Sequence, residues 1–207
     1  MDEFGLIRQY FAAAPCAQAA AGVALGIGDD CALLQLSPGE QLAISTDTLV
    51  AGVHFPDPCD AFRLGQRSLA VAASDLAGMG ATPLGFTLAL SLPTATPAWL
   101  QGFAAGLNQM AQGCGLVLIG GDTTRGPLSI AVTAMGLVET GAALRRDGAR
   151  MGDDVWVTGT LGDAAAALQC LQQARAVPPA LKARLDRPTP RIAAGQRLSA
   201  LASSCID

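Results

Sequence analysis

The sequence has 207 residues, 51% of them hydrophobic and 14% charged, which suffices for one large domain, or one domain and part of a second, and argues against disorder. Its net charge of −4 argues against nucleic-acid binding as the main function, and no apolar run reaches the roughly 18 residues that a membrane span needs. The N-terminus lacks the features of a signal peptide. The six cysteines are scattered and there is a single histidine, which makes a disulfide framework or a zinc site improbable. We therefore expect a cytoplasmic protein with free thiols.

Apolar periodicity and capping signals predict helices and strands in alternation along the first part of the chain. Asp60 is expected to cap a helix that the sequence GMGATP ends, and Thr96-Pro97 to start a second helix that ends between Gly113 and Gly115. The expected elements are helix 2–14, strand 42–49, helix 61–78, strand 86–92, the helix that starts at 96, and strands 116–119 and 128–138.

A polar, arginine-rich stretch at 145–154 interrupts this pattern and is the predicted domain boundary. We expect residues 1–144 to form an N-terminal domain and residues 145–207 to begin a second one. The chain stops where an apolar strand is about to start, so we expect the second domain to be truncated. The elements expected after the boundary are a strand at 155–158, a turn in GTLGD, a helix near 163–176, proline-rich connectors at 178–179 and in RPTPR, and a helix at about 191–203.

Lysine is almost absent: Lys182 is the only one, and the other basic residues are arginines. A P-loop needs the lysine of its GK[ST] ending, and a protein kinase needs a lysine on a strand beside the nucleotide. Neither motif occurs. Any phosphoryl chemistry of this chain therefore has to rest on metal ions, arginine and backbone amides.

Aspartates stand beside glycines or inside apolar sequence in four segments. These are GIGDDCA (26–32), STDTL (45–49), AASDLAGMG (72–80) and IGGDTTRG (119–126). No basic residue lies between Arg8 and Arg63 or between Arg67 and Arg125, so local salt bridges cannot neutralise these carboxylates. Burying an unpaired carboxylate costs several kcal/mol unless it is hydrogen-bonded or bound to a cation.

A hard divalent cation shared by these segments would remove that cost. Mg²⁺ fits best, because it binds few carboxylates and completes its shell with water and phosphate oxygens, and Ser45 and Thr46 add neutral oxygens beside Asp47. The structural alternative is that Asp29 or Asp30 caps a turn, that Asp122 supports a Gly-Gly turn, or that Asp75 pairs with a distant arginine.

Other segments also allow two interpretations. Gly120 and Gly121 could let backbone amides approach a phosphate, or could simply form a tight turn. The same choice applies to GTLGD, which opens a helix. His54, seven residues after Asp47, could contact a ligand or be structural, and the Arg145-Arg146 pair could be solvated or could hold a phosphate.

Taken in series, the motifs resemble the thiamine-monophosphate kinase family, within the superfamily that includes aminoimidazole ribonucleotide synthetase. The resemblance covers nearly the whole chain in family order. The segments that carry it are GIGDDCALL, AISTDTLVAGVHF, LAVAASDLAGMGATP, LIGGDTTRGPLS, RDGARMGDDVWVTGTLGDAAA and RPTPR. The resemblance implies an α/β (α+β) fold, in which an N-terminal domain with a mixed sheet and helices is followed by the start of a second α/β domain. It also implies a homodimer that forms through the N-terminal domains.

The resemblance also implies a reaction and its residues. ATP would phosphorylate thiamine monophosphate to thiamine diphosphate by direct in-line transfer with several Mg²⁺ ions and no dedicated catalytic side chain. Gly121, Asp122 and Arg146 would bind ATP, and His54 would bind thiamine monophosphate. The metal ligands would be Asp30, Ser45, Thr46, Asp47, Asp75, Asp122 and Asp207. The family commonly has Ser at position 147, so Asp147 adds a negative charge beside Arg146.

Two other functions remain open at this point. The chain could belong to another ATP-dependent enzyme of the superfamily, such as an aminoimidazole ribonucleotide synthetase-like enzyme, or it could be a non-catalytic nucleotide- or metal-binding module. Since the family places further metal and substrate residues after Asp207, we expect the 207-residue chain to be inactive or nearly so by itself.

Overall fold

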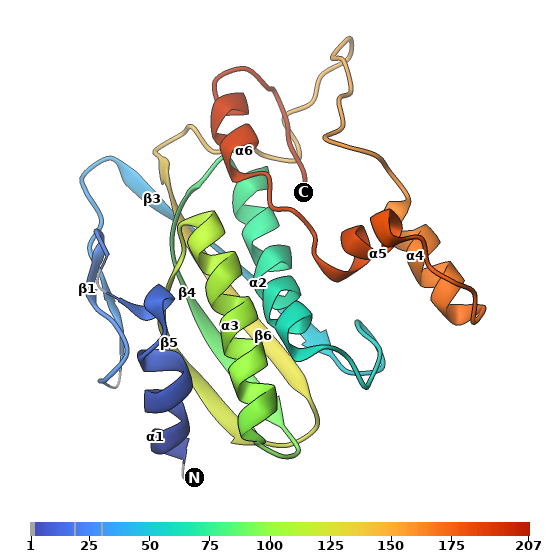
Figure 1. Ribbon diagram of the computed structural model, residues 1–207. Coiled ribbons are helices and arrows are strands. Elements are labelled where there is room, and N and C mark those ends of the chain that lie inside the picture. The colour runs from blue at the N-terminus through green and yellow to red at the C-terminus, as the bar shows by residue number, and fades with distance from the viewer. Residues whose placement is uncertain (1–2, 19, 30) are drawn as a thin grey trace.

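The computed structural model describes residues 3–18, 20–29 and 31–207, and its centre is a four-stranded sheet (Figure 1). The strands, in spatial order, are β3 (Glu40–Val50), β6 (Ser129–Glu139), β4 (Thr82–Leu92) and β5 (Val117–Arg125). Strand β6 is antiparallel to both of its neighbours, whereas β4 and β5 are parallel. The predicted mixed α/β fold is therefore confirmed.

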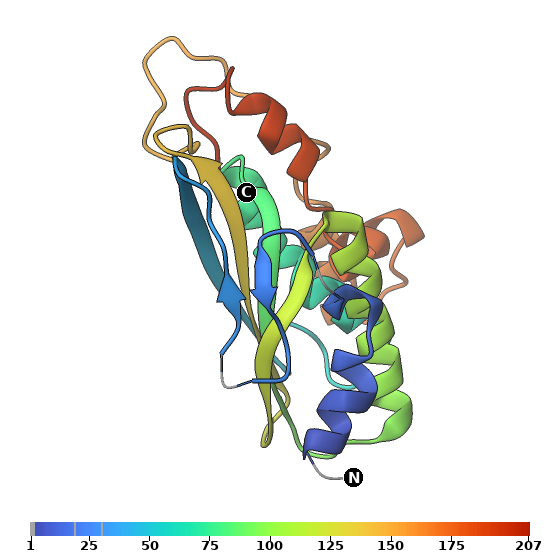
Figure 2. The same ribbon diagram turned by 90° about the vertical axis from the view of Figure 1, so that its left-hand side faces the viewer.

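Two long helices cover one face of this sheet. Helix α2 (Ala61–Gly78) connects β3 to β4, and α3 (Pro97–Cys114) connects β4 to β5. Both connections join strands of the same direction and step the same way across the sheet, so two right-handed crossovers bring both helices to the same face. Figure 2 shows the helices on one side and the opposite face of the sheet free of them. We call this second side the open face.

Helix α2 begins and ends where the sequence predicts. The Asp60 side chain accepts a hydrogen bond of 2.8 Å from the backbone N–H of Arg63, and the last turn contains no basic residue. Its inner face buries Leu69 and Leu76 against the sheet, in one core with Phe86 of β4 and Phe103 of α3. The burial of this face, more than intrinsic propensity, holds α2 in place.

Helices α2 and α3 cross at glycines, which let their backbones touch. A Cβ atom on Gly65 would overlap the Phe103 carbonyl oxygen, and one on Gly106 would overlap the Phe62 carbonyl oxygen. Beside this crossing, the side chains of Gln66 and Gln109 hydrogen-bond to each other across the two helices. The close approach is possible only without side chains at both glycines.

The N-terminal part packs beside α3. The predicted helix 2–14 is present as α1 (Glu3–Leu6) continued by the π-helical η1 (Ile7–Ala12), and a short 3-10 turn, η2 (Pro15–Ala17), follows. The sequence did not predict the small hairpin of β1 (Val23–Leu25) and β2 (Leu33–Leu34).

Several predictions for the remaining chain are wrong. The strand expected at 116–119 is longer than predicted: β5 continues through Gly120 and Gly121 to Arg125, so the tight-turn alternative for this glycine pair is wrong. Residues 155–158 form no strand, since no other described segment pairs with them, and Trp156 is 87% exposed. The proline-rich connector contains helix α5 (Pro179–Asp186), while α4 (Asp163–Gln172) and α6 (Ile192–Leu198) are shorter than expected. Within the described residues, no helix is both long and apolar enough to cross a membrane.

Candidate active site

Strand β3 and the last turn of α2 bring three of the predicted site residues together. Because side chains alternate along a strand, Ser45 and Asp47 point to the helix-covered face and are half-buried there. Asp75 lies on α2 above them, and the Ser45 hydroxyl donates a hydrogen bond to its carboxylate. One hydroxyl and two carboxylates thus meet between the strand and the helix.

In the described part of the chain, no basic side chain pairs with the negative charge of this cluster. Burial raises the pKa of Asp47 above its ordinary value of 3.8, and the nearby carboxylates of Asp75 and Asp207 raise it further. Among the described residues, no ion pair includes any of these three aspartates. The alternative in which Asp75 pairs with a distant arginine is therefore wrong.

Asp207 reaches the cluster because the end of the chain folds back along residues 145–148. The carbonyl oxygen of Arg145 accepts bonds from the Ser204 hydroxyl, at 2.9 Å, and from the Cys205 N–H, at 3.3 Å. This leaves the backbone nitrogen of Asp207 only 3.2 Å from where a Cβ atom on Gly78 would stand. The glycine at the end of α2 therefore allows the terminal segment to approach Asp75.

The donor set suits a hard cation. Within the part of the chain that the structure describes, no three His, Cys, Asp or Glu side chains are arranged to hold a metal ion. Mg²⁺ does not need three, because it commonly binds one or two protein carboxylates and takes water and phosphate oxygens for the rest. Asp47, Asp75 and the Ser45 hydroxyl fit that requirement.

Thr46 lies on the other side of the sheet. Its side chain points to the open face, where its hydroxyl is 2.9 Å from that of Thr133 on β6. The side chain is therefore separated from Ser45 and Asp47 by the sheet itself.

Gly121 and Asp122 are on β5, at the opposite edge of the sheet from β3. The ladder runs from Asp47 through Val132 and Leu88 to Gly121, so three strand spacings, about 14 Å, separate the two edge strands. Gly121 has a φ of +152°, and a Cβ atom there would overlap the Leu88 carbonyl oxygen. Close backbone approach, and not a turn, explains this glycine.

The other predicted ligand residues are spread around this centre. His54 is exposed in a tight turn after β3, and its Nδ1 accepts a 3.0 Å hydrogen bond from the Val50 N–H, which leaves Nε2 to carry the proton. Arg146 is exposed and pairs with no described acidic residue, whereas Arg145 donates hydrogen bonds of 2.8 and 3.0 Å to Asp147. Asp30 lies outside the described residues.

The raised pKa of Asp47 predicts how an Asp47→Asn variant behaves without metal. A carboxyl whose pKa is higher in the folded than in the unfolded protein contributes stability that is complete below about pH 3.8 and is lost as the pH rises through the folded-state pKa. At neutral pH in EDTA, Asp47→Asn should therefore unfold at the same temperature as wild type or above it. The advantage of the variant should shrink towards pH 4.

In excess Mg²⁺, wild type should instead unfold at a higher temperature than Asp47→Asn. Wild type gains stability from Mg²⁺ by mass action, and Asp47→Asn should gain less because it has lost a ligand. Thermal melts of both proteins in EDTA and in excess Mg²⁺ measure the two effects. A large loss of stability in the variant that is independent of metal would instead mean that Asp47 has a structural partner.

Comparison with known proteins gives consistent matches. Residues 28–138 match the family "AIR synthase related protein, N-terminal domain". A thiamine-monophosphate kinase of Escherichia coli K12 is 50% identical over 210 aligned residues, which cover 99% of this chain and 64% of that protein. The chain thus spans 64%, slightly less than two thirds, of the length of these curated relatives.

Solved structures agree with the sequence match. A thiamine-monophosphate kinase from Stenotrophomonas maltophilia K279a superposes with a TM-score of 0.82 at 54% identity, over 89% of this chain and 61% of that one. The structure described as "AaThiL complexed with AMPPCP and TMP" superposes with a TM-score of 0.76 at 30% identity, over 82% of this chain and 56% of that one.

Proposed function

Since this chain belongs to the AIR synthase related family through its N-terminal domain, we propose that it is the metal- and ATP-binding part of a thiamine-monophosphate kinase. The reaction would transfer the γ-phosphoryl group of ATP to thiamine monophosphate and give thiamine diphosphate and ADP. The observation that carries the proposal is the cluster of Ser45, Asp47 and Asp75, with Asp207 beside it and no basic partner among residues 3–18, 20–29 and 31–207. A relative of the same fold binds AMPPCP, an ATP analogue, together with TMP.

The chemistry needs alignment and neutralised charge more than covalent help. We propose that Asp47, Asp75 and Ser45, with Asp207 and Asp30, hold Mg²⁺, which would neutralise the charge that develops on the transferred phosphoryl group. Gly121 and Asp122 on β5 and the unpaired Arg146 would bind ATP. Of the predicted metal ligands, the Thr46 side chain on the open face and Asp122 on the far edge strand are not part of this cluster.

The direct test is a phosphoryl-transfer assay. The 207-residue chain and a chimera that continues it with the C-terminal third of the Escherichia coli relative are incubated with ATP, Mg²⁺ and thiamine monophosphate. We expect the chimera to form thiamine diphosphate and ADP in equal amounts. No transfer to thiamine monophosphate, but transfer to an aminoimidazole precursor, would favour the other enzyme of the superfamily.

We propose that His54 serves the acceptor and not ATP. In the chimera, His54→Ala should raise KM for thiamine monophosphate by about tenfold, the effect of losing one charged hydrogen bond, while KM for ATP changes little. His54→Asn is the control, because its side-chain oxygen can replace Nδ1 as acceptor for the Val50 N–H. If His54→Asn restores wild-type kinetics, His54 is structural.

We also propose a homodimer through the open face. Ile44 is 60% exposed there, and its neighbours on that face are small or apolar, which suits a second copy of the sheet. Sedimentation equilibrium should give twice the chain mass of 20.9 kDa. Ile44→Lys should halve that mass, whereas Leu168→Lys, an exposed leucine on α4, should leave it unchanged. A monomeric wild type would contradict the proposal.

Two further assignments belong to this proposal. Residues 1–144 would be the N-terminal domain, and residues 145–207 would belong to a second α/β domain that buries the exposed Val155 and Trp156 in its own sheet. The protein would act in the cytoplasm, where its six free cysteines stay reduced.

A further inference from the structure

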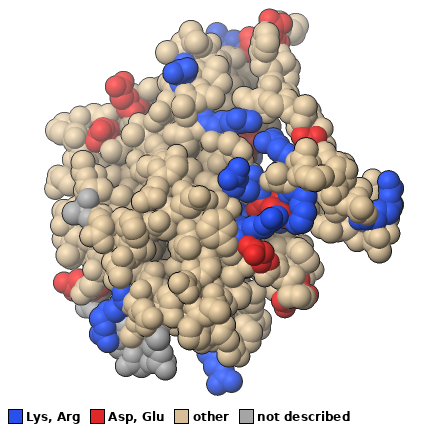
Figure 3. Space-filling model, in the orientation of Figure 1, with Lys and Arg blue, Asp and Glu red and all other residues tan. Residues whose placement is uncertain are grey.

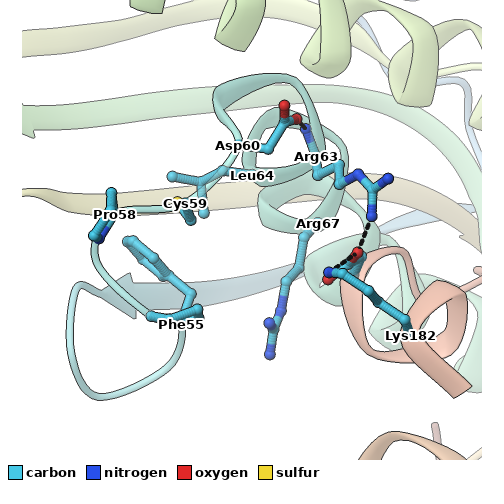
Figure 4. A pocket seen from close by; sticks show the side chains of 10 residues that line it. Phe55, Pro58, Cys59, Asp60, Arg63, Leu64, Arg67 and Lys182 are labelled. Carbon is cyan, nitrogen blue, oxygen red and sulfur yellow. Dashed lines mark hydrogen bonds and ion pairs between the residues drawn. The ribbon is translucent and has the colours of Figure 1, made fainter. Parts of the chain in front are cut away.

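A pocket of about 210 Å³ lies at the opposite end of α2 from Asp75, where α5 packs against the first turns of that helix. Its walls come from the loop after His54, from α2 and from α5 (Figure 4). The residues that line it are Phe55, Pro56, Pro58, Cys59, Asp60, Arg63, Leu64, Arg67, Lys182 and Asp186. The volume is below the roughly 300 Å³ at which pockets for drug-sized ligands begin, so a whole nucleotide does not fit.

The pocket contains more positive than negative side chains. Arg63 and Lys182 both pair with Asp186: the Arg63 pair connects α2 to α5, and the Lys182 pair, at 2.6 Å, lies within α5. Asp60 is occupied as the cap of α2. In the space-filling view, Lys and Arg side chains gather around acidic ones where α5 meets the body of the protein (Figure 3).

Arg67 is the third basic residue that lines the pocket, and it does not take part in the ion pairs with Asp186. It forms no ion pair with any residue that the structure describes, and its Nε is buried there without a hydrogen-bond partner. Burial lowers the pKa of its guanidinium, so the charge is held there at a cost in free energy. Figure 4 shows the Arg67 side chain extending between the Phe55 loop and Lys182, away from the pair that Arg63 makes. Buried donors without a partner are rare in native proteins and point to a missing acceptor.

The remaining walls are apolar. Phe55 and Leu64 are 5% and 3% exposed, and Pro58 lies beside Phe55. If the anionic group of a ligand accepts hydrogen bonds from Arg67, the rest of that ligand would lie against this aromatic and aliphatic surface. Arginine suits planar carboxylates and phosphates, to which it donates two parallel hydrogen bonds.

We propose that this pocket binds a small organic anion, a phosphate or a carboxylate on a flat apolar group, with Arg67 as its anchor. The site is separate from the metal cluster, because Asp75 comes eight positions after Arg67 on α2, about 12 Å along the helix. It does not depend on the proposed function: the pocket contains none of the residues assigned to ATP or metal.

The test follows the Nε–H resonance of Arg67 by nuclear magnetic resonance, in the 207-residue protein and in EDTA. Phenyl phosphate, benzoate and inorganic phosphate are titrated separately. We expect phenyl phosphate or benzoate, or both, to shift this resonance with a dissociation constant in the millimolar range, typical of so small a ligand, and inorganic phosphate to bind at least about fivefold more weakly. The arms with phenyl phosphate and benzoate show which anionic group the pocket prefers.

Variants on the two sides of the pocket should change the affinity in opposite directions. Arg67→Gln, followed through the backbone amide resonances of the pocket because its own Nε–H is lost, should bind about tenfold more weakly. Asp186→Asn should bind about threefold more tightly, because it removes a negative charge that acts on Arg67. Asp186→Asn also keeps the test valid if Arg67→Gln does not fold. The control is Arg175→Gln, an exposed arginine outside the pocket, which should bind as wild type does.

The proposal is overturned if neither organic anion shifts the Arg67 resonance, if inorganic phosphate binds as tightly as phenyl phosphate, or if Asp186→Asn leaves the affinity unchanged. Replacing EDTA by excess Mg²⁺ should not alter the titration. A requirement for Mg²⁺ would assign the anion to the metal cluster instead and would also overturn the proposal.

Discussion

Gly106→Ala should lower the free energy of unfolding by about 2–3 kcal/mol, although it adds a single methyl group. The added Cβ would overlap the Phe62 carbonyl oxygen, which belongs to the backbone of α2 and cannot rotate away. The two helices would have to separate, and the separation would reach Gly65 and Phe103 on the other side of the crossing. Urea unfolding followed by circular dichroism measures the difference.

Gly113→Ala is the matched control, since the same substitution is made on the same helix. A Cβ atom at Gly113 meets nothing within 4 Å, and alanine is the better helix former, so this variant should be stabilised by about 0.5–1 kcal/mol. If both variants unfold at the same urea concentration, the close crossing of α2 and α3 does not contribute to stability as proposed here.

Asp75→Asn should reduce kcat/KM for phosphoryl transfer by about a hundredfold or more, roughly 2.7 kcal/mol of transition-state stabilisation. Asparagine keeps the shape of the side chain and can still accept from the Ser45 hydroxyl, but it removes one of the two carboxylates that face each other. The measurement is steady-state kinetics of the chimera at increasing Mg²⁺, and the variant should also need more Mg²⁺ for half-maximal rate.

The control for this variant is Asp60→Asn on the same helix. Asp60 caps the first turn, and asparagine is about as good a cap, so its kinetics should stay within about threefold of wild type. Wild-type turnover by Asp75→Asn at low Mg²⁺ would contradict the metal site between β3 and α2, whereas a loss in both variants would indicate general damage to α2.

The parts of the fold that the sequence predicts well are those set by local signals. Helix α2 starts at the Asp60 cap and ends at the glycines after it, and both signals stand in the sequence. Helix α5 was missed because Pro179 was interpreted as a connector, although proline is common in the first turn of a helix. The strand expected at 155–158 has the right residues, but a strand also needs a partner, and a local pattern cannot supply one.

The sequence predicted the part of the site in which carboxylates lack basic neighbours. It could not predict the parts whose positions depend on the order of the strands in the sheet. The absence of basic residues around Asp47 and Asp75 predicted a shared partner, and the structure brings these two carboxylates together. That Thr46 faces away from its neighbours follows from strand alternation and could have been predicted. The distance of Asp122 depends on the order β3-β6-β4-β5, and Arg67 became notable only once α5 was seen to pack beside it.

The last turn of α2, which contains no basic residue, has an electrostatic consequence of its own. The aligned peptide dipoles of an α-helix leave about half a negative charge at its C-terminal end, where a lysine or arginine would be favourable but α2 has none. In α2 this partial charge adds to the carboxylates of Asp75 and Asp47. The field there attracts cations over about 10 Å at 0.1 M salt and weakens as ionic strength rises. Under the proposed function, a divalent ion would therefore collect at this end of α2 before the nucleotide binds.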